Sequence, residues 1–220
     1  LGCDMSETLT PTTSAVYQPH GDEGDYITLF AYMDGVLFKM TDAKGSVSFS
    51  LNAEEITVMK FNYIGKYHPV EDVVFPTGIV FTGFQQPLTV GDSNTQTYTI
   101  AGLDLVTKSF SIDLANQVSW RNWINDAGVR SPDRKPTASA VFEMTNVATK
   151  DWASDVLTGT VMPLEIVHGL VPGNIVTIEA PKLQFNQEPS LSDEDKTALL
   201  NASFAVMPNT GNDELVLTFT

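Results

Sequence analysis

The chain has 220 residues, of which 42% are hydrophobic and 18% are charged, and its 12 Lys and Arg against 27 Asp and Glu give a formal net charge of −15. This charge repels phosphates, which argues against sequence reading of nucleic acid. No apolar run approaches the roughly 18 residues that span a bilayer, so we expect a folded chain with no membrane partner. The single cysteine, Cys3, excludes an internal disulfide.

The first third of the chain predicts strands separated by turns. The segment YITLFAYMDGVLFKM at 26–40 is strand-like, and apolar residues then alternate with polar ones at 47–51 and 59–63. Such alternation is typical of half-buried strands. TDAKGS at 41–46 is predicted to be a turn between strands.

An extended stretch at 66–97 leads to the predicted strand YTIAGLDL at 98–105. GDSN at 91–94 resembles the nucleophile block of GDSL-type esterases, but such enzymes need an α/β scaffold and a late Asp-x-x-His. The His candidate, His168, falls within a predicted strand. We therefore interpret GDSN as a hairpin turn and treat a hydrolase as a minor alternative.

The stretch NQVSWRNWINDAGVRSPDRKP at 116–136 combines aromatic and basic residues in an otherwise acidic chain. Trp and Arg are enriched at interface centres, and a basic arm has a natural partner in another acidic copy. A long loop folded back on its own sheet is the alternative. The candidate subunit-interface residues are Trp120, Arg121, Trp123, Arg130, Arg134 and Lys135.

One short helix is expected at 149–159, where Thr149 can cap, Trp152 and Val156 share a face, and Gly159 can end the helix. Alternation then resumes at 202–206 and 215–219, with turns at VPGN 171–174 and NTGND 209–213. The segment 192–201 could form a helix or a strand, and we favour the strand. The fold class is therefore all-β, as packed sheets or a barrel.

A short phrase recurs along the chain. VTIEAPKLQF at 176–185 aligns with ITLFAYMDGVLFKM at 27–40, and the block 149–220 aligns with residues 1 to about 65. This predicts a tandem duplication with a first β domain at 1–86, including a linker, and a second β domain at 87–220. Because the counterpart of the 149–158 helix would end at residues 1–3, the first copy is expected to lack its front strands, which would lie upstream.

No cofactor or metal is predicted. His20, His68 and His168 are scattered, and none has a second His or Cys at ligand spacing. The acidic clusters GDEGD at 21–25 and SDED at 192–195 lack the spaced ligands of an EF-hand loop. We interpret both as solvated turns.

The phrases DGVLFKMTDAKGSVSFSLNAEEI, SFSIDLANQVSWRN, DRKPTASAVFEM, LEIVHGLVPGNIVTIEAPKLQF and GNDELVLTF occur in this order. The whole set resembles the tail tube (major tail) proteins of long-tailed bacteriophages and prophages, over nearly the whole chain. The resemblance implies a β-sandwich with a flanking helix and a long loop, whose subunits form stacked rings.

That resemblance implies a structural virion protein without catalysis, assembled in the bacterial host cytoplasm and located in the phage tail. Its partners would be itself, in trimeric or hexameric rings, and other tail proteins, with the genome passing through without specific binding. An acidic inner wall would suit such passage.

A different class stays open as an alternative. Trp120 and Trp123 could be sugar-stacking platforms of a carbohydrate-binding or adhesin-like β-sandwich module.

Overall fold

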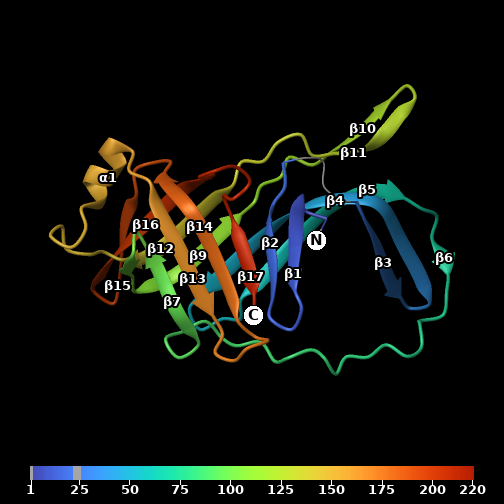
Figure 1. The fold of residues 1–220 in the computed structure, drawn as a ribbon, viewed down its shortest axis with the longest axis horizontal. Coiled ribbons are helices and arrows are strands. Elements are labelled where there is room, and N and C mark those ends of the chain that lie inside the picture. Colours follow the sequence, from blue (N-terminus) through green and yellow to red (C-terminus); the bar gives the residue numbers. More distant parts are fainter. Residues whose placement is uncertain (1, 22–25) are drawn as a thin grey trace.

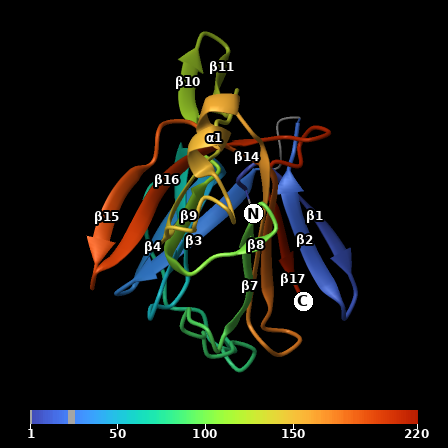
Figure 2. The ribbon, with the colours of Figure 1, turned by 90° about the vertical axis from the view of Figure 1, so that its left-hand side faces the viewer.

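The computed structural model describes residues 2–21 and 26–220, which form seventeen strands and one short helix. Most strands belong to two facing layers, seen edge-on in Figure 2. Layer A contains strands from both ends of the chain, namely β1 (Met5–Thr10), β2 (Ser14–Pro19), β7 (Thr95–Ile100), β8 (Leu103–Asp104), β13 (Met162–His168), β14 (Val176–Phe185) and β17 (Val216–Phe219). Layer B contains β4 (Val36–Asn52), β5 (Val58–Tyr67), β9 (Thr107–Asp113), β12 (Thr137–Glu143), β15 (Ser190–Glu194) and β16 (Thr197–Met207).

All the pairings in both layers are antiparallel, and β14 connects the layers. The strand order of layer A is β8-β7-β13-β14-β17-β2-β1, and that of layer B is β15-β16-β12-β9-β4-β5. Val176–Glu179 of β14 pair with β17, whereas Lys182–Phe185 pair with β16. This change of partner turns one hydrogen-bonded sheet into a sandwich.

The core lies between the two layers, where alternate residues of each strand point inward. Layer B contributes the fully buried rings of Phe49, Phe110, Phe142 and Phe204. Layer A contributes smaller side chains such as Ile166. The aromatic rings of layer B pack against the aliphatic side chains of layer A and fill the space between the sheets. A core built almost entirely from strands confirms the expected all-β class.

The helix α1 (Trp152–Thr158) closes one end of the sandwich (Figure 1). Its N-cap is Asp151, whose carboxylate accepts from the Ser154 N–H at 3.0 Å, rather than the predicted Thr149. Gly159 ends the helix in the left-handed conformation, as predicted. Trp152 is buried against the Phe142 ring, with centroids 5.2 Å apart.

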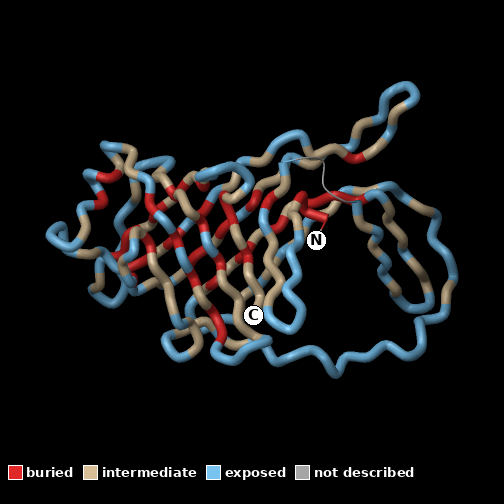
Figure 3. The backbone as a smooth tube through the Cα atoms, in the orientation of Figure 1, coloured by how far each residue is buried: buried red, intermediate tan, exposed pale blue. Residues whose placement is uncertain are grey.

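An extension projects from the opposite end of the sandwich. It consists of β3 (Ile27–Met33), the first part of β4 that pairs with β3, and the short β6 (Glu71–Asp72). Residues 73–88, here called the strap, then return along the molecule without regular structure to β7 (Figure 1). Buried residues are concentrated in the sandwich, whereas the strap is mostly exposed and the extension mixes exposed and half-buried residues (Figure 3).

The prediction of a turn at 41–46 was wrong. β4 runs unbroken from Val36 to Asn52, and the turn-like letters mark an irregularity in its pairing, where Asp42 adopts a φ of 51°. Lys44 lies inside the protein because Asp4 neutralises it at 3.1 Å. The segment 192–201 is not helical: 192–194 end β15, 195–196 form the hairpin turn, and 197–201 begin β16, so the favoured strand is confirmed on either side of that turn.

Strands from the two predicted domains pair directly. β4 pairs with β9, and β2 pairs with β17, although residue 86 separates the members of each pair in the sequence. The segments proposed as repeats also differ in form, because 27–40 folds as a hairpin and 176–185 as one strand. The division at residue 86 and the duplication stay predictions.

Candidate assembly surface

The stretch 116–136, here called the arm, leaves the sandwich between β9 and β12 and returns to it. Its centre is the hairpin of β10 (Ser119–Trp123) and β11 (Asp126–Arg130), which forms its own two-stranded sheet and points away from both layers (Figure 1). Asn125, with a φ of 65°, makes the tight turn. The base of the hairpin packs against β4 and β5, whereas its tip is exposed, and a hairpin with an exposed apolar tip suggests a partner.

The arm tip is apolar and exposed. Trp123 is 67% exposed and Ile124 is 93% exposed. The Arg121 guanidinium lies 4.3 Å from the centre of the Trp123 ring and forms an ion pair with Asp126. Arg130 approaches the same carboxylate at 3.5 Å, so the charges on the hairpin are partly neutralised within it.

The two tryptophans of the arm do not form one surface. They are three residues apart on one strand, so their side chains point to opposite faces of the ribbon. Trp120 lies opposite Val129, which is fully buried at the base of the hairpin.

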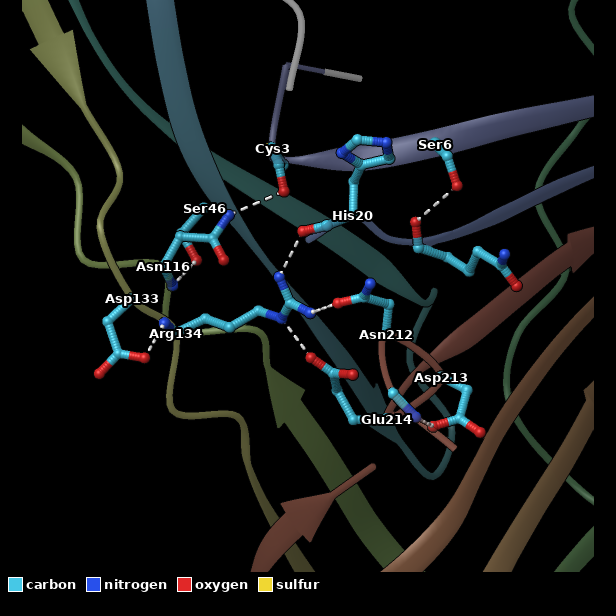
Figure 4. Close-up of polar contacts among 12 residues, drawn as sticks. Cys3, Ser6, His20, Ser46, Asn116, Asp133, Arg134, Asn212, Asp213 and Glu214 are labelled. Atoms are coloured by element: carbon cyan, nitrogen blue, oxygen red, sulfur yellow. Dashed lines mark hydrogen bonds and ion pairs between the residues drawn. The ribbon is translucent and has the colours of Figure 1, made fainter. Parts of the chain in front are cut away.

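Arg134 anchors the arm to the sandwich (Figure 4). Its guanidinium forms an ion pair with Glu214 and donates to the carbonyl of His20 and to the side chain of Asn212, both at 2.7 Å. Glu214 is buried, and an open cavity of about 770 Å³ beside the cluster leaves Arg134 partly exposed. One side chain thus joins the arm to the N-terminal hairpin and to the loop before β17.

Asn116 fixes the other root of the arm (Figure 4). Its side-chain amide donates to the carbonyls of Cys3 and Gly45, at 2.7 and 2.9 Å. The carbonyl of Val129 accepts from the Tyr26 hydroxyl at 3.3 Å. Because both ends of the arm are hydrogen-bonded to neighbouring segments, the direction in which the arm leaves the sandwich is fixed.

The six predicted interface residues therefore occupy different environments. Trp120, Arg121, Trp123 and Arg130 belong to the projecting hairpin. Lys135 is exposed at its base, whereas Arg134 faces the sandwich and has intramolecular partners. Whether these residues contact another subunit stays a prediction.

The extension and strap carry an apolar surface that the sequence did not indicate as a site. Phe30, Met33 and Phe38 are exposed on the extension. The strap lacks any charged residue and exposes Val74, Phe75, Val80, Phe81 and Phe84. Large exposed apolar patches mark interaction sites. The absence of charged residues over 73–88 is the one feature of the sequence that could have indicated this surface.

The GDSN segment forms a turn, with the Asn94 N–H bonded to the Gly91 carbonyl at 3.0 Å. His168 contacts the Thr95 hydroxyl at 3.1 Å and the Leu88 carbonyl at 3.3 Å, so its ring holds the end of the strap to layer A. This arrangement directs neither imidazole nitrogen to Ser93.

Over residues 2–21 and 26–220, no three His, Cys, Asp or Glu residues are grouped in a way that could hold a metal ion. The prediction that SDED at 192–195 is a turn was wrong for 192–194, which belong to β15, and the turn is made by Asp195 and Lys196. Residues 22–25 of the other acidic cluster lie outside the described residues. No helix among the described residues is long and apolar enough to cross a membrane.

Comparison with known families decides the identity of the chain. Residues 6–216 match the family described as phage tail tube protein. The chain belongs to this family. It is accordingly a structural component of the phage tail, from a family whose members associate with themselves and with other tail proteins. A search of curated proteins gave no match.

Proposed function

We propose that this tail tube protein assembles into rings that stack into the tail tube, the conduit for genome ejection, without catalysing a reaction. The family match over residues 6–216 is the observation that carries the proposal. The exposed arm, extension and strap support it, because an isolated subunit would leave these apolar surfaces in water. We expect trimeric or hexameric rings and assembly in the host cytoplasm.

The arm is the proposed contact between stacked rings. It projects beyond both layers, its roots are fixed by Asn116 and Arg134, and its tip presents Trp123 and Ile124. Exposed apolar residues on a rigid support are suited to insertion into a neighbouring subunit.

Electron microscopy of the purified protein tests the function directly. Rings or tubes with a central channel are the expected result. A strictly monomeric protein at high concentration, in the presence of other tail proteins, would contradict the proposal.

The role of the arm is tested by the double variant Trp123→Ser, Ile124→Ser. Both side chains are exposed, so the free energy of unfolding should change by only about 0.5 kcal/mol. Tube length should fall sharply while rings persist. Leu157→Ser is the matched control, because Leu157 is equally exposed on α1, at the far end of the sandwich. If the control shortens tubes as much as the arm variant does, the arm has no special role.

The carbohydrate-binding alternative receives no support from the arm. Sugar stacking needs a ring face open to the ligand, yet Arg121 lies over Trp123, and Trp120 points to the opposite face.

A further inference from the structure

The end of layer B opposite the arm carries two adjoining cavities. The arm leaves the sheet beyond the last residue of β9 and returns at the first residue of β12, so the other ends of these strands, Thr107 and Glu143, lie away from it. The Glu143 N–H donates to the Val106 carbonyl at 2.8 Å, which holds the two strand ends side by side. β15 borders this end, far from the arm hairpin (Figure 1). Because the arm points away from both layers, only the arm of a second copy can reach these cavities.

The first cavity is apolar and has a volume of about 420 Å³. It opens between the two layers, and the buried side chains of Leu51, Leu105 and Phe110 form part of its wall. Val106 stands at its border and is 66% exposed. A cavity of about 150 Å³ holds a benzene ring, so this one has room for an indole. An apolar side chain that filled it would leave water and complete the packing of this end of the core.

The apolar cavity also contains a polar group without a matching partner. Tyr98 lines the cavity from β7, and the Tyr98 hydroxyl is buried without a hydrogen bond of normal geometry. The nearby Thr107 hydroxyl donates instead to the Leu105 carbonyl, at 3.2 Å. Buried tyrosine hydroxyls usually have a partner, because an unpaired polar group away from water costs free energy. A side chain that brings an N–H group into the cavity would supply this partner.

The second cavity, of about 660 Å³, is acidic. It shares Val106 and Lys108 with the first cavity. Lys108 is the only basic residue of its lining and is ion-paired with Glu194. The other carboxylates of the lining have no ion pair within the part of the chain that the structure describes; they are Glu54, Glu55, Glu143 and Asp195. A positive group that arrives beside the apolar cavity is therefore attracted.

The arm tip matches this pair of cavities. Trp123 is large, apolar and 67% exposed, and its indole carries an N–H donor. The Arg121 guanidinium lies 4.3 Å from the centre of the same ring. Asp126 already pairs with Arg121, so burial of the indole supplies most of the attraction and the charge mainly orients the tip.

We propose that Trp123 of one copy inserts into the apolar cavity of a copy in the next ring, with its indole N–H directed to the Tyr98 hydroxyl. This inference rests on the proposed stacking of rings and names the surface that receives the arm. The arm and the cavity lie at opposite ends of the same strands, so the contact joins different surfaces of two copies. Such a heterologous contact repeats in one direction and builds an open filament rather than a closed dimer.

Disulfide trapping in assembled tubes tests the insertion. Ile124→Cys, which leaves Trp123 in place, is combined in the same chain with Val106→Cys or Ala53→Cys at the cavities. Oxidation should give a ladder of covalent multimers for at least one pair. Burial raises the pKa of the Cys3 thiol, which keeps it protonated and slow to react, and the parent chain controls for it.

The control pair is Ile124→Cys with Leu157→Cys, because Leu157 is exposed but does not line either cavity. It should give no ladder. Tubes that yield the Leu157 ladder, or no ladder from either cavity pair, overturn this inference and leave the proposed function standing. Failure of the parent chain to form rings or tubes overturns both.

A double-mutant cycle tests the hydrogen bond to Tyr98. Tyr98→Phe should raise the protein concentration needed for tube formation severalfold, with little effect on unfolding of the subunit, because its hydroxyl has no partner there. In a chain that already carries Trp123→Phe, which lacks the N–H, Tyr98→Phe should have no further effect. The exposed Tyr67→Phe is the control and should leave the concentration unchanged. Equal effects of Tyr98→Phe with and without the indole would overturn the proposed direction of the N–H.

Discussion

Lys44 is the only lysine among the fully buried side chains of the described residues, and Asp4 is its ion-pair partner at 3.1 Å. The Tyr26 ring lies 4.9 Å from the same ammonium group. Removing one partner of a buried pair leaves the other charge without compensation, and we expect Lys44→Met to lower the free energy of unfolding by about 3–5 kcal/mol.

Chemical denaturation measures this loss. Lys108→Met is the matched control, because Lys108 and Glu194 form an ion pair with both side chains half exposed, and its loss should cost at most about 1 kcal/mol. Combining Lys44→Met with Asp4→Asn should recover part of the stability. Equal losses for the two lysines would show that burial of the Lys44 pair has no special effect.

Asp213 makes the loop before β17 sensitive to acid. Its carboxylate accepts from the Thr210 hydroxyl at 2.7 Å and from the backbone N–H of Asn209, Thr210 and Gly211, which lowers its pKa from 3.8 to about 2. Because the pKa of Asp213 is lower in the folded protein than in the unfolded chain, its ionised carboxylate stabilises the fold at pH values above 3.8. This stability is lost as the pH falls from 3.8 through about 2.

The variant Asp213→Asn should therefore show a flatter dependence of stability on pH than the parent between pH 3.8 and about 2. Unfolding in denaturant at several pH values measures the difference between the two proteins. Parallel curves would contradict a role for Asp213. Because Asn212 and Glu214 flank it and hold Arg134, opening of this loop should also loosen the arm.

At the scale of elements, the pairing of β4 with β5 depends on a glycine. A Cβ atom on Gly45 would lie 2.4 Å from the Asn62 carbonyl oxygen, which is part of the backbone and cannot rotate away. We expect Gly45→Ala to destabilise the protein by about 1–3 kcal/mol through overpacking.

Gly128→Ala in β11 is the control, because a Cβ atom there meets nothing within 4 Å. Its effect should stay within about 0.5 kcal/mol. Thermal unfolding of both variants is the measurement, and a neutral Gly45→Ala would mean that β5 can shift to make room.

The same strand shows how far the sequence predicts the elements. Alternation identified Val47, Phe49 and Leu51 as an inward face, because the rule that successive residues point to opposite sides is local. TDAKGS could not be recognised as strand, since Lys44 is neutralised by a residue forty positions away and Gly45 is required by the neighbouring β5. These causes exist only in the folded protein.

At the scale of the whole molecule, the strap is the expected site of proteolysis. Its aromatic residues Phe75, Phe81 and Phe84 are exposed in a segment without regular structure, so chymotrypsin should cut there first. The two fragments should remain associated, because β4 pairs with β9 and β2 with β17 across the cut.

Mass spectrometry of the fragments and gel filtration of the cut protein measure both expectations. First cleavage in the arm, or separation of the fragments, would contradict this account. Protection of the strap in assembled rings would further indicate that another copy covers it.

The candidate assembly surface was predictable only in part. Unusual composition identified the arm, because aromatic and basic residues stand out in an acidic chain. Composition could not distinguish Arg134, which bonds to the sandwich, from Arg130 on the projecting hairpin. The sequence predicted a strand-like segment at 26–40 but not that its apolar residues would be exposed, since a local pattern does not reveal whether a second layer covers the strand.

Four serines lie opposite one another across layer B, in the order Ser50, Ser111, Ser139 and Ser203, and directly opposed residues share a face of the sheet. The Ser111 and Ser139 hydroxyls lie 2.8 Å apart and bond to each other, so their hydrogen-bonding capacity is partly used within the sheet. Short side chains tied to their neighbours offer little for a phosphate to grip. One of the two hydroxyl protons is thus used inside the sheet, and the row presents short, uncharged side chains rather than the fixed positive charges that would hold a phosphate.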